Sequence, residues 1–174
     1  MKKTEVRISG LGGQGVVAAG QILGRAAVYD GKNVVQTQSY GAEARGSAAK
    51  SEVIISNDKI GFPTVRQSDI LVTMSQEALD KYLKDLKEEG VLIVDSTYVK
   101  KIPETKAKTY KIPATEEAER MFGAKIHANM LILGALTKII GINAKAVEKA
   151  VEETLGKKVA NTNIEAFRKG RSLS

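Results

Sequence analysis

The chain has 174 residues, with 27 Lys and Arg against 20 Asp and Glu, and its formal net charge at pH 7 is +7. This length is sufficient for one domain with a substantial buried core. The chain has no Cys and one His. By itself it therefore offers no disulfide, no thiol nucleophile, no cysteine ligands for zinc or an iron–sulfur cluster, and no site built from several histidines.

No segment is predicted to cross a membrane or to act as a signal peptide. The most apolar stretch, Met130–Ile140, has about half of the roughly 20 residues that a membrane-spanning helix needs, and Lys138 interrupts it. The first residues, MKKTE, lead directly into a strand pattern without the apolar segment of a signal peptide. We therefore expect a cytoplasmic protein with no membrane contact.

Basic residues cluster in two stretches, 100–111 and 157–171. We expect a solvated basic surface there, and the alternative is attraction of an acidic ligand or protein. The sequence has neither an aromatic-rich strand for base stacking nor a helix-turn-helix pattern, so it does not favour nucleic-acid binding.

The first half of the chain alternates short strands with helical spacing. In chain order we expect a strand at Val6–Ser9, a helix at Val16–Val28 that ends at Asp30 and Gly31, strands at Val34–Gln38, Glu52–Ser56 and Ile70–Met74, and an amphipathic helix at Glu77–Glu88. The apolar face of that last helix consists of Leu79, Tyr82, Leu83 and Leu86, and Gly90 is expected to end it.

The second half is predicted to be richer in helix. In chain order we expect strands at Val91–Val94 and Thr109–Ile112, a helix from Pro113 to near Gly123, an apolar helix at Ala128–Ile140 ended by Gly141, a helix at Ala144–Leu155 between Asn143 and Gly156, and a helical piece at Asn163–Arg168. This alternation predicts an α/β domain with a largely parallel sheet covered on both faces. We expect one domain over residues 1–174, with 157–174 as a partly mobile tail.

A glycine-rich loop lies between the first predicted strand and the first predicted helix. Residues 10–15, GLGGQG, fit the pattern G-x-G-x-x-G. Glycine allows positive φ and close approach of a ligand to the backbone, and the first amides of a helix have no partner within the helix. The loop therefore predicts an anion-binding site, worth about 0.3–1 kcal/mol and up to roughly 2 when buried. The alternative is a turn that only packs the helix on the sheet.

A nicotinamide dinucleotide would require a further acid. In that fingerprint an Asp or Glu about 20 residues onward, at the end of the second strand, binds the ribose. The chain has Gln36, Thr37, Gln38 and Ser39 there, and Asp30 comes before the strand. NAD is therefore disfavoured.

A second loop, residues 39–47, follows the second predicted strand. It should lie at the carboxyl edge of the sheet, where ligands bind in parallel α/β folds. It contains Tyr40, Glu43 and Arg45. The guanidinium of Arg45 is suited to carboxylates and phosphates, and an internal ion pair with Glu43 is the equal alternative.

The two loops together resemble one family. Residues 10–15, with QTQSYGAEARG at 36–46, are similar to the gamma subunit of 2-oxoacid:ferredoxin oxidoreductases, and the similarity continues through 112–115 and 129–136. It covers roughly residues 5 to 155. The form QTQSYG resembles the 2-oxoglutarate members most. Ala42 stands where a proline is common in the family, and Ser47 where a glycine is common.

The resemblance implies a three-layer, Rossmann-like α/β/α fold and a place in a larger enzyme. That enzyme oxidatively decarboxylates a 2-oxoacid, transfers the acyl group to coenzyme A and reduces ferredoxin. The alpha and beta subunits hold thiamine diphosphate with Mg, and iron–sulfur clusters lie on the beta chain and on a delta, ferredoxin-like chain. The gamma subunit binds no cofactor alone and lies near the access route for coenzyme A and substrate.

The resemblance also assigns the candidate residues. They would form a wall that faces either the phosphates of coenzyme A or the thiamine-binding partner chains, and they are Gly10, Gly12, Gly13, Gln14, Gly15, Tyr40, Gly41, Glu43, Arg45 and Gly46. None of them is expected to be catalytic or to bind a metal. His127 is predicted to be a partly exposed residue at a helix end, and Asn129 and Met130 are predicted to lie in the core or an interface. Ser96 and Thr97 are weaker candidates.

Three alternatives stay open. Within the same chemistry, the chain could be a subunit of an indolepyruvate or a pyruvate/ketoisovalerate oxidoreductase. Outside it, the rivals are a free-standing dinucleotide-binding oxidoreductase and a non-enzymatic nucleotide-binding or regulatory module. The free-standing oxidoreductase would need a ribose-binding acid and a catalytic group of its own, and the sequence shows neither convincingly.

Overall fold

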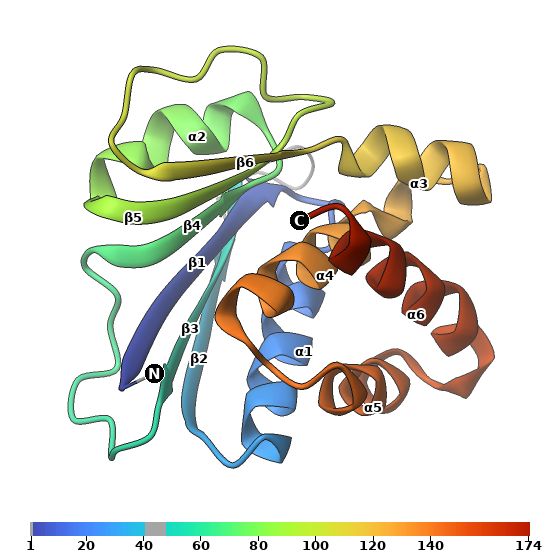
Figure 1. The fold of residues 1–174 in the computed structure, drawn as a ribbon, viewed down its shortest axis with the longest axis horizontal. Coiled ribbons are helices and arrows are strands. Elements are labelled where there is room, and N and C mark those ends of the chain that lie inside the picture. The colour runs from blue at the N-terminus through green and yellow to red at the C-terminus, as the bar shows by residue number, and fades with distance from the viewer. Residues whose placement is uncertain (1, 41–47) are drawn as a thin grey trace.

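The computed structural model describes residues 2–40 and 48–174, and these form a mixed sheet of six strands between two layers of helices (Figure 1). The strands are β1 (Lys3–Leu11), β2 (Asn33–Tyr40), β3 (Ala48–Ser56), β4 (Ser68–Thr73), β5 (Leu86–Asp95) and β6 (Lys108–Ile112). Their order in the sheet is β2-β3-β1-β4-β5-β6. The predicted α/β class is confirmed.

The sheet is parallel except around β3. The pairs β1–β4, β4–β5 and β5–β6 are parallel, whereas β3 runs antiparallel to both β1 and β2. The chain between Tyr40 and Ala48 is too short for the crossover that a parallel neighbour requires. Consequently β1 and β2 point the same way, and their carboxyl ends flank the start of β3, where Leu11 pairs with Ala48 and Tyr40 with Ala49.

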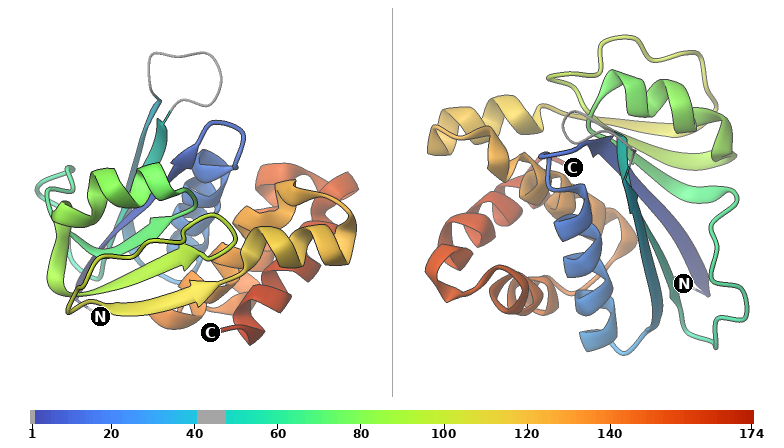
Figure 2. Two further views of the ribbon diagram at one scale, coloured as in Figure 1. Left: turned by 90° about the horizontal axis from the view of Figure 1, so that it is seen from above. Right: turned by 180° about the vertical axis from the view of Figure 1, so that it is seen from behind.

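The helices divide unequally between the two faces of the sheet (Figure 2). The larger layer contains α1 (Val16–Tyr29), α4 (Ala128–Ile140), α5 (Ala144–Leu155) and α6 (Lys157–Ser172), whose buried side chains share one apolar cluster with the sheet. On the other face, α2 (Gln76–Tyr82) packs on β4 and β5 in a smaller apolar cluster. The remaining elements are α3 (Ala114–Phe122) and two short 3₁₀ turns, η1 (Leu83–Asp85) and η2 (Lys125–His127).

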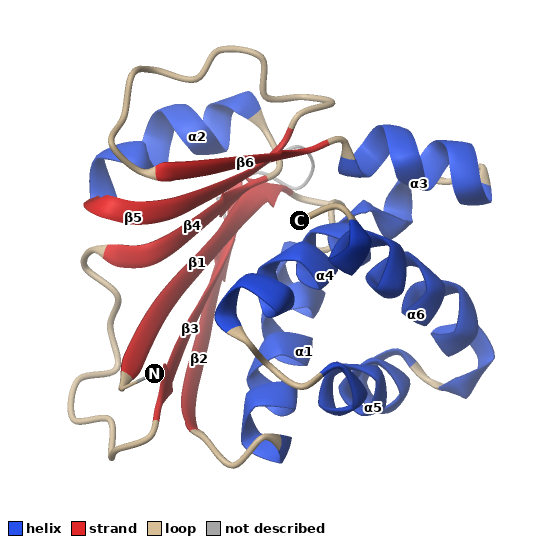
Figure 3. Ribbon diagram, viewed as in Figure 1, coloured by secondary structure: helices blue, strands red, loops and turns tan. Residues whose placement is uncertain are grey.

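The helix predicted at Glu77–Glu88 is only half correct. The α-helix ends at Tyr82, and β5 begins at Leu86, so Gly90 lies inside a strand rather than after a helix (Figure 3). Leu86 has the helical spacing but pairs with Ser68 in the sheet instead. A Cβ at Gly90 would lie 2.8 Å from the carbonyl oxygen of Asp69, so glycine is needed for the close approach of β4 and β5.

The C-terminal helix is longer than predicted. Only Asn163–Arg168 was expected to be helical, whereas α6 covers Lys157–Ser172 and buries Phe167 completely. It packs on α4 with the two backbones in close contact at Gly134 and Gly170. An added methyl group at either glycine would collide with main-chain atoms of the other helix. These two glycines lie in stretches where the sequence pattern gives no sign of the contact.

A buried ionic cluster lies on the α2 side of the sheet. Arg7 on β1 is 4% exposed, and its Nε and Nη2 atoms donate to Glu52 Oε2 on β3 at 3.1 and 2.9 Å. Its Nη1 donates to Asp85 in η1 at 3.2 Å, and Nη2 also donates to the carbonyl oxygen of Val65 at 3.0 Å. One guanidinium thus joins two strands, η1 and the loop between β3 and β4.

Within the described part of the chain, every helix is too short or too polar to cross a lipid bilayer.

Candidate functional site

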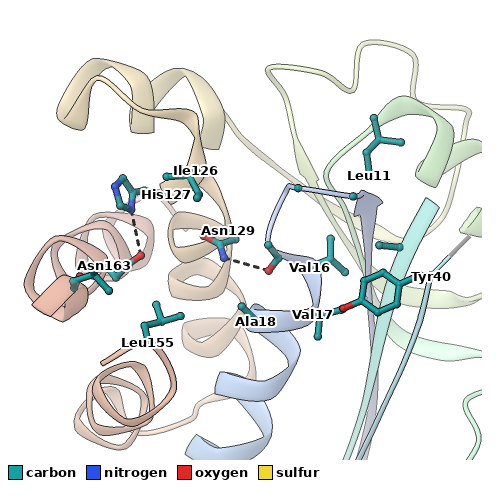
Figure 4. Close-up of a pocket in the computed structure, with 15 residues that line it drawn as sticks. Leu11, Val16, Val17, Ala18, Tyr40, Ile126, His127, Asn129, Leu155 and Asn163 are labelled. Atoms are coloured by element: carbon teal, nitrogen blue, oxygen red, sulfur yellow. Dashed lines mark hydrogen bonds between the residues drawn. The ribbon is translucent and has the colours of Figure 1, made fainter. Parts of the chain in front are cut away.

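A pocket of about 560 Å³ opens where the carboxyl ends of β1 and β2 meet the first turns of α1 and α4 (Figure 4). It is lined by Leu11, Gly12, Gly13, Gly15, Val16, Val17, Ala18, Tyr40, Ala49, Ile126, His127, Asn129, Leu155, Val159 and Asn163. The structure therefore brings four of the sequence candidates together, namely Gly12, Gly13, Gly15 and Tyr40. Because β2 runs in the direction of β1, its last residue reaches the same edge as the glycine loop.

The pocket side of the glycine loop presents free backbone amides. Gly13 and Gly15 have φ of 90° and 76°, a conformation that favours glycine. Helix α1 begins at Val16, and no side chain caps its N-terminus. Its first amides, at Val16, Val17 and Ala18, therefore have neither a partner inside the helix nor a cap. All three residues line the pocket.

The sheet side of the same loop is closed. The Leu11 N–H donates to Gln14 Oε1 at 2.7 Å, and Gln14 Nε2 donates to the carbonyl oxygen of Met74 at 2.9 Å. A Cβ at Gly10 would lie 2.6 Å from Gln14 Oε1 and 3.2 Å from the Met74 side chain. Gly10 and Gln14 therefore fix the loop against the end of β4 and do not line the pocket. Gln14 instead borders a separate cavity of about 160 Å³ beside Tyr98.

Asn129, in the first turn of α4, is buried, in line with its predicted place in the core or an interface, but it also lines the pocket, which the sequence did not indicate. The residue is 6% exposed, and its Nδ2 donates to the carbonyl oxygen of Gly15 at 3.2 Å. Its Oδ1 has no hydrogen-bond partner in the structure, although buried amide oxygens are usually paired. A Cβ at Gly15 would collide with this amide. The available signal was a lone amide among the apolar residues of the first turns of α4.

The far wall of the pocket comes from the C-terminal helices. His127 is partly exposed at the N-terminus of α4, as predicted, and its Nδ1 lies 3.2 Å from Asn163 Oδ1 on α6. Its ring also meets Phe122 edge to face. The rim carries large exposed apolar side chains, namely Tyr40, Ile126 and Val159. The described lining contains no Lys, Arg, Asp or Glu. Its polar groups are therefore backbone amides, the Tyr40 hydroxyl, Asn129 and the His127–Asn163 pair.

The structure does not place the other sequence candidates in this pocket. Gly41, Glu43, Arg45 and Gly46 fall outside the described residues. The Oγ1 of Thr97 accepts from the Glu116 N–H at 3.0 Å, so this residue fixes the start of α3. No cluster of three or more His, Asp or Glu able to hold a metal ion occurs within residues 2–40 and 48–174.

Comparison with known proteins gives consistent matches over nearly the whole chain. Residues 5–173 match the family "Pyruvate ferredoxin/flavodoxin oxidoreductase". The chain is 51% identical to the 2-oxoglutarate synthase subunit KorC of Methanocaldococcus jannaschii, over 99% of this chain and 94% of the relative.

Two solved structures share the fold. The gamma subunit of a keto/oxoacid ferredoxin oxidoreductase from Geobacter sulfurreducens is 44% identical, with a TM-score of 0.86 over 97% of this chain and 96% of that one. A 2-oxoglutarate:ferredoxin oxidoreductase from Magnetococcus marinus, with 2-oxoglutarate, coenzyme A and succinyl-CoA bound, has a TM-score of 0.91 and 24% identity. The match covers 99% of this chain and 31% of that one, and it shows the fold alone.

Proposed function

Because the chain belongs to the gamma subunits of the 2-oxoacid:ferredoxin oxidoreductases, we propose that it serves an enzyme that converts 2-oxoglutarate and coenzyme A to an acyl-CoA while reducing ferredoxin. The choice of 2-oxoglutarate is supported by the 51% identity to a 2-oxoglutarate synthase subunit. In this proposal thiamine diphosphate, Mg and the iron–sulfur clusters belong to the alpha, beta and delta partners. This chain supplies no catalytic residue.

We place part of coenzyme A in the pocket at the glycine loop. The observation that carries this assignment is the uncapped N-terminus of α1 beside the buried, unpartnered Oδ1 of Asn129. Free helix amides suit the oxygen atoms of an anion, and Oδ1 can accept a hydrogen bond from an amide or amine N–H. Coenzyme A offers both kinds of group, in its phosphates and in the amides and adenine that it also carries.

The residues of the pocket would bind and orient this cofactor. Gly12 and Gly13 let the backbone approach it closely, and the amides of the first turn of α1 would contribute about 0.3–1 kcal/mol toward an anionic group, up to about 2 in a partly buried site. The apolar rim, with Tyr40, would exclude water. On the family resemblance of the sequence, we also assign Gly41, Glu43, Arg45 and Gly46 to this wall. When bound, coenzyme A supplies the thiol that accepts the acyl group.

The anion-binding role is tested in the reconstituted complex with Val17→Glu and its neutral match Val17→Gln. A carboxylate in the first turn favours helix α1, so the fold should be retained. We expect Val17→Glu to raise the KM for coenzyme A about tenfold, equivalent to about 1–2 kcal/mol, with the KM for 2-oxoglutarate unchanged. Equal effects of the Glu and Gln variants would refute an anion at these amides.

Arg45→Ala tests the second loop in the same assay. We expect it to raise the KM for coenzyme A or to weaken subunit assembly. If both are unchanged, Arg45 has no part in this wall.

The substrate is tested by the specificity of the same complex. We expect kcat/KM for 2-oxoglutarate to exceed the values for pyruvate and 2-oxoisovalerate. A preference for either of these two would assign the chain to a pyruvate/ketoisovalerate enzyme instead.

A further inference from the structure

The two edge strands of the sheet are β6 and β2 (Figure 3), and they differ in their protection against pairing with another strand. At one edge, β6 has five residues, two of which are Lys108 and Lys111, and Pro113 follows it directly. At the other edge, β2 has eight residues, NVVQTQSY, without charge or proline. Free edges are usually protected by charges, prolines, bulges or covering elements. Within residues 2–40 and 48–174, edge β6 has such protection and edge β2 does not.

A groove runs beside the unprotected edge. It has a volume of about 560 Å³ and is lined by Gln21, Gly24, Arg25, Val28, Tyr29, Val34, Gln36 and Thr154. Val34 and Gln36 project from β2 toward α1, since both lie within 4 Å of a Cβ built at Gly24. A strand added to β2 would point every second side chain toward the same groove.

The groove has an apolar wall that faces solvent. Val28 is 55% exposed, and Tyr29 is also exposed. The hydroxyl of Tyr29 donates to Glu153, and the ammonium of Lys149 lies 4.2 Å from its ring centroid, so the ring is held in position. This wall offers a fixed contact for one apolar side chain.

The groove also contains the cation of Arg25. Arg25 is exposed and forms no ion pair with any of the residues that the structure describes. Its guanidinium would pair with a carboxylate. A second copy of this chain would instead bring another Arg25 and the same net charge of +7, which disfavours pairing of two β2 edges.

We propose that β2 accepts an extended segment of another subunit of the oxidoreductase, which adds a strand to the sheet, places an apolar side chain against Val28 and pairs an acidic one with Arg25. Main-chain hydrogen bonds would supply affinity, and the groove would select the alternate side chains. Since Tyr40 ends β2 and lines the pocket at the glycine loop, the added strand would reach the mouth of that pocket. The inference does not depend on what the pocket binds.

Photocrosslinking within the assembled complex tests the occupant. A benzophenone amino acid at position 28 is expected to crosslink to an extended segment of another subunit, identified by mass spectrometry. The matched control is the same substitution at Phe62, an exposed apolar residue outside the groove, which should not give that product. Crosslinking only to a second copy of this chain, or none in an intact complex, would overturn the proposal.

Charge variants test the contact itself. We expect Arg25→Glu to weaken assembly about tenfold or more in Kd, and Arg25→Gln to weaken it less. Exchanging the crosslinked acid for Lys in the partner should restore assembly with Arg25→Glu. Because Arg25 is exposed, the melting temperature of the Arg25→Glu variant should match that of the unaltered chain. Unchanged Kd for a folded Arg25→Glu would refute the pairing.

Discussion

Two buried polar clusters in this domain are built in opposite ways. On the α2 side of the sheet, Arg7 donates to Glu52, Asp85 and Val65, so each arm of its guanidinium has a partner within the chain. On the opposite side, Asn129 is buried at the pocket with one partner for its Nδ2 and none for its Oδ1.

The difference separates scaffold from site. A fully partnered buried charge joins elements and is costly to break, whereas a half-partnered amide leaves capacity for a ligand. The glycine loop and the first turn of α1 repeat this contrast. Its sheet side is closed by Gln14, and its pocket side leaves the amides of Val16 and Val17 free.

Arg7→Met should give the largest effect. Removing the cation leaves Glu52 buried without its main partner, and such losses amount to about 3–5 kcal/mol of unfolding free energy, measured by urea denaturation. The double variant Arg7→Met/Glu52→Leu should recover most of the loss. The matched control is Lys106→Met, which breaks an exposed pair with Glu88 and should cost no more than about 1 kcal/mol. A loss below about 1 kcal/mol for Arg7→Met would contradict the scaffold role.

Gly15→Ala should give the next largest effect. The residue has φ of 76°, and an added Cβ would collide with Asn129. Gly31→Ala is the control, because Gly31 has φ of 80° and open space around its Cβ position. Strained backbone alone costs of order 1–3 kcal/mol, so both variants lose stability and Gly15→Ala loses more. Equal losses would mean that the contact between Gly15 and Asn129 is easily relieved.

Asn129→Leu should change binding more than stability. The variant removes the unsatisfied Oδ1 and one hydrogen bond, and the expected change in unfolding free energy is about 1 kcal/mol or less. In the reconstituted complex, we expect a higher KM for coenzyme A with unchanged KM for 2-oxoglutarate. A loss of about 3 kcal/mol with unchanged KM would make Asn129 part of the scaffold.

The smallest effect concerns an exposed ion pair on the Arg7 side of the sheet. The hydrogen bond to Asp69 raises the pKa of Lys87. Since the folded pKa exceeds the unfolded one, this pair contributes its full stabilisation while the unfolded ammonium is also charged, and the contribution is lost as pH rises through the raised pKa of Lys87. The ammonium is partly exposed, so the effect stays below about 1 kcal/mol. The difference in unfolding free energy between the unaltered chain and Lys87→Met should shrink from pH 8 to pH 11. A difference that grows over this range would contradict the raised pKa of Lys87.

Local signals predicted α4 and α5 well. The helix over Ala128–Ile140 and the one over Ala144–Leu155 begin and end where expected, because Asn143, Gly141 and Gly156 act as caps. The region 77–90 failed because pairing of Leu86 in the sheet overrides a helical spacing of apolar residues.

The site was predictable only where its residues are adjacent in sequence. The glycine loop and Tyr40 carry recognisable patterns. Asn129 is 114 residues from the Gly15 carbonyl that it contacts, and nothing in its own neighbourhood indicates this partner. The antiparallel direction of β3 follows from the short connection after Tyr40. The amino-acid composition of the strand does not indicate this direction.

Hydrogen–deuterium exchange in the reconstituted complex, with and without coenzyme A, tests the assignment of the pocket most directly. The account predicts that the amides of Val16, Val17 and Ala18 exchange more slowly when coenzyme A is bound, while amides on the Arg7 side of the sheet are unchanged. Equal exchange at these three amides with and without the cofactor would show that coenzyme A does not bind at this helix N-terminus.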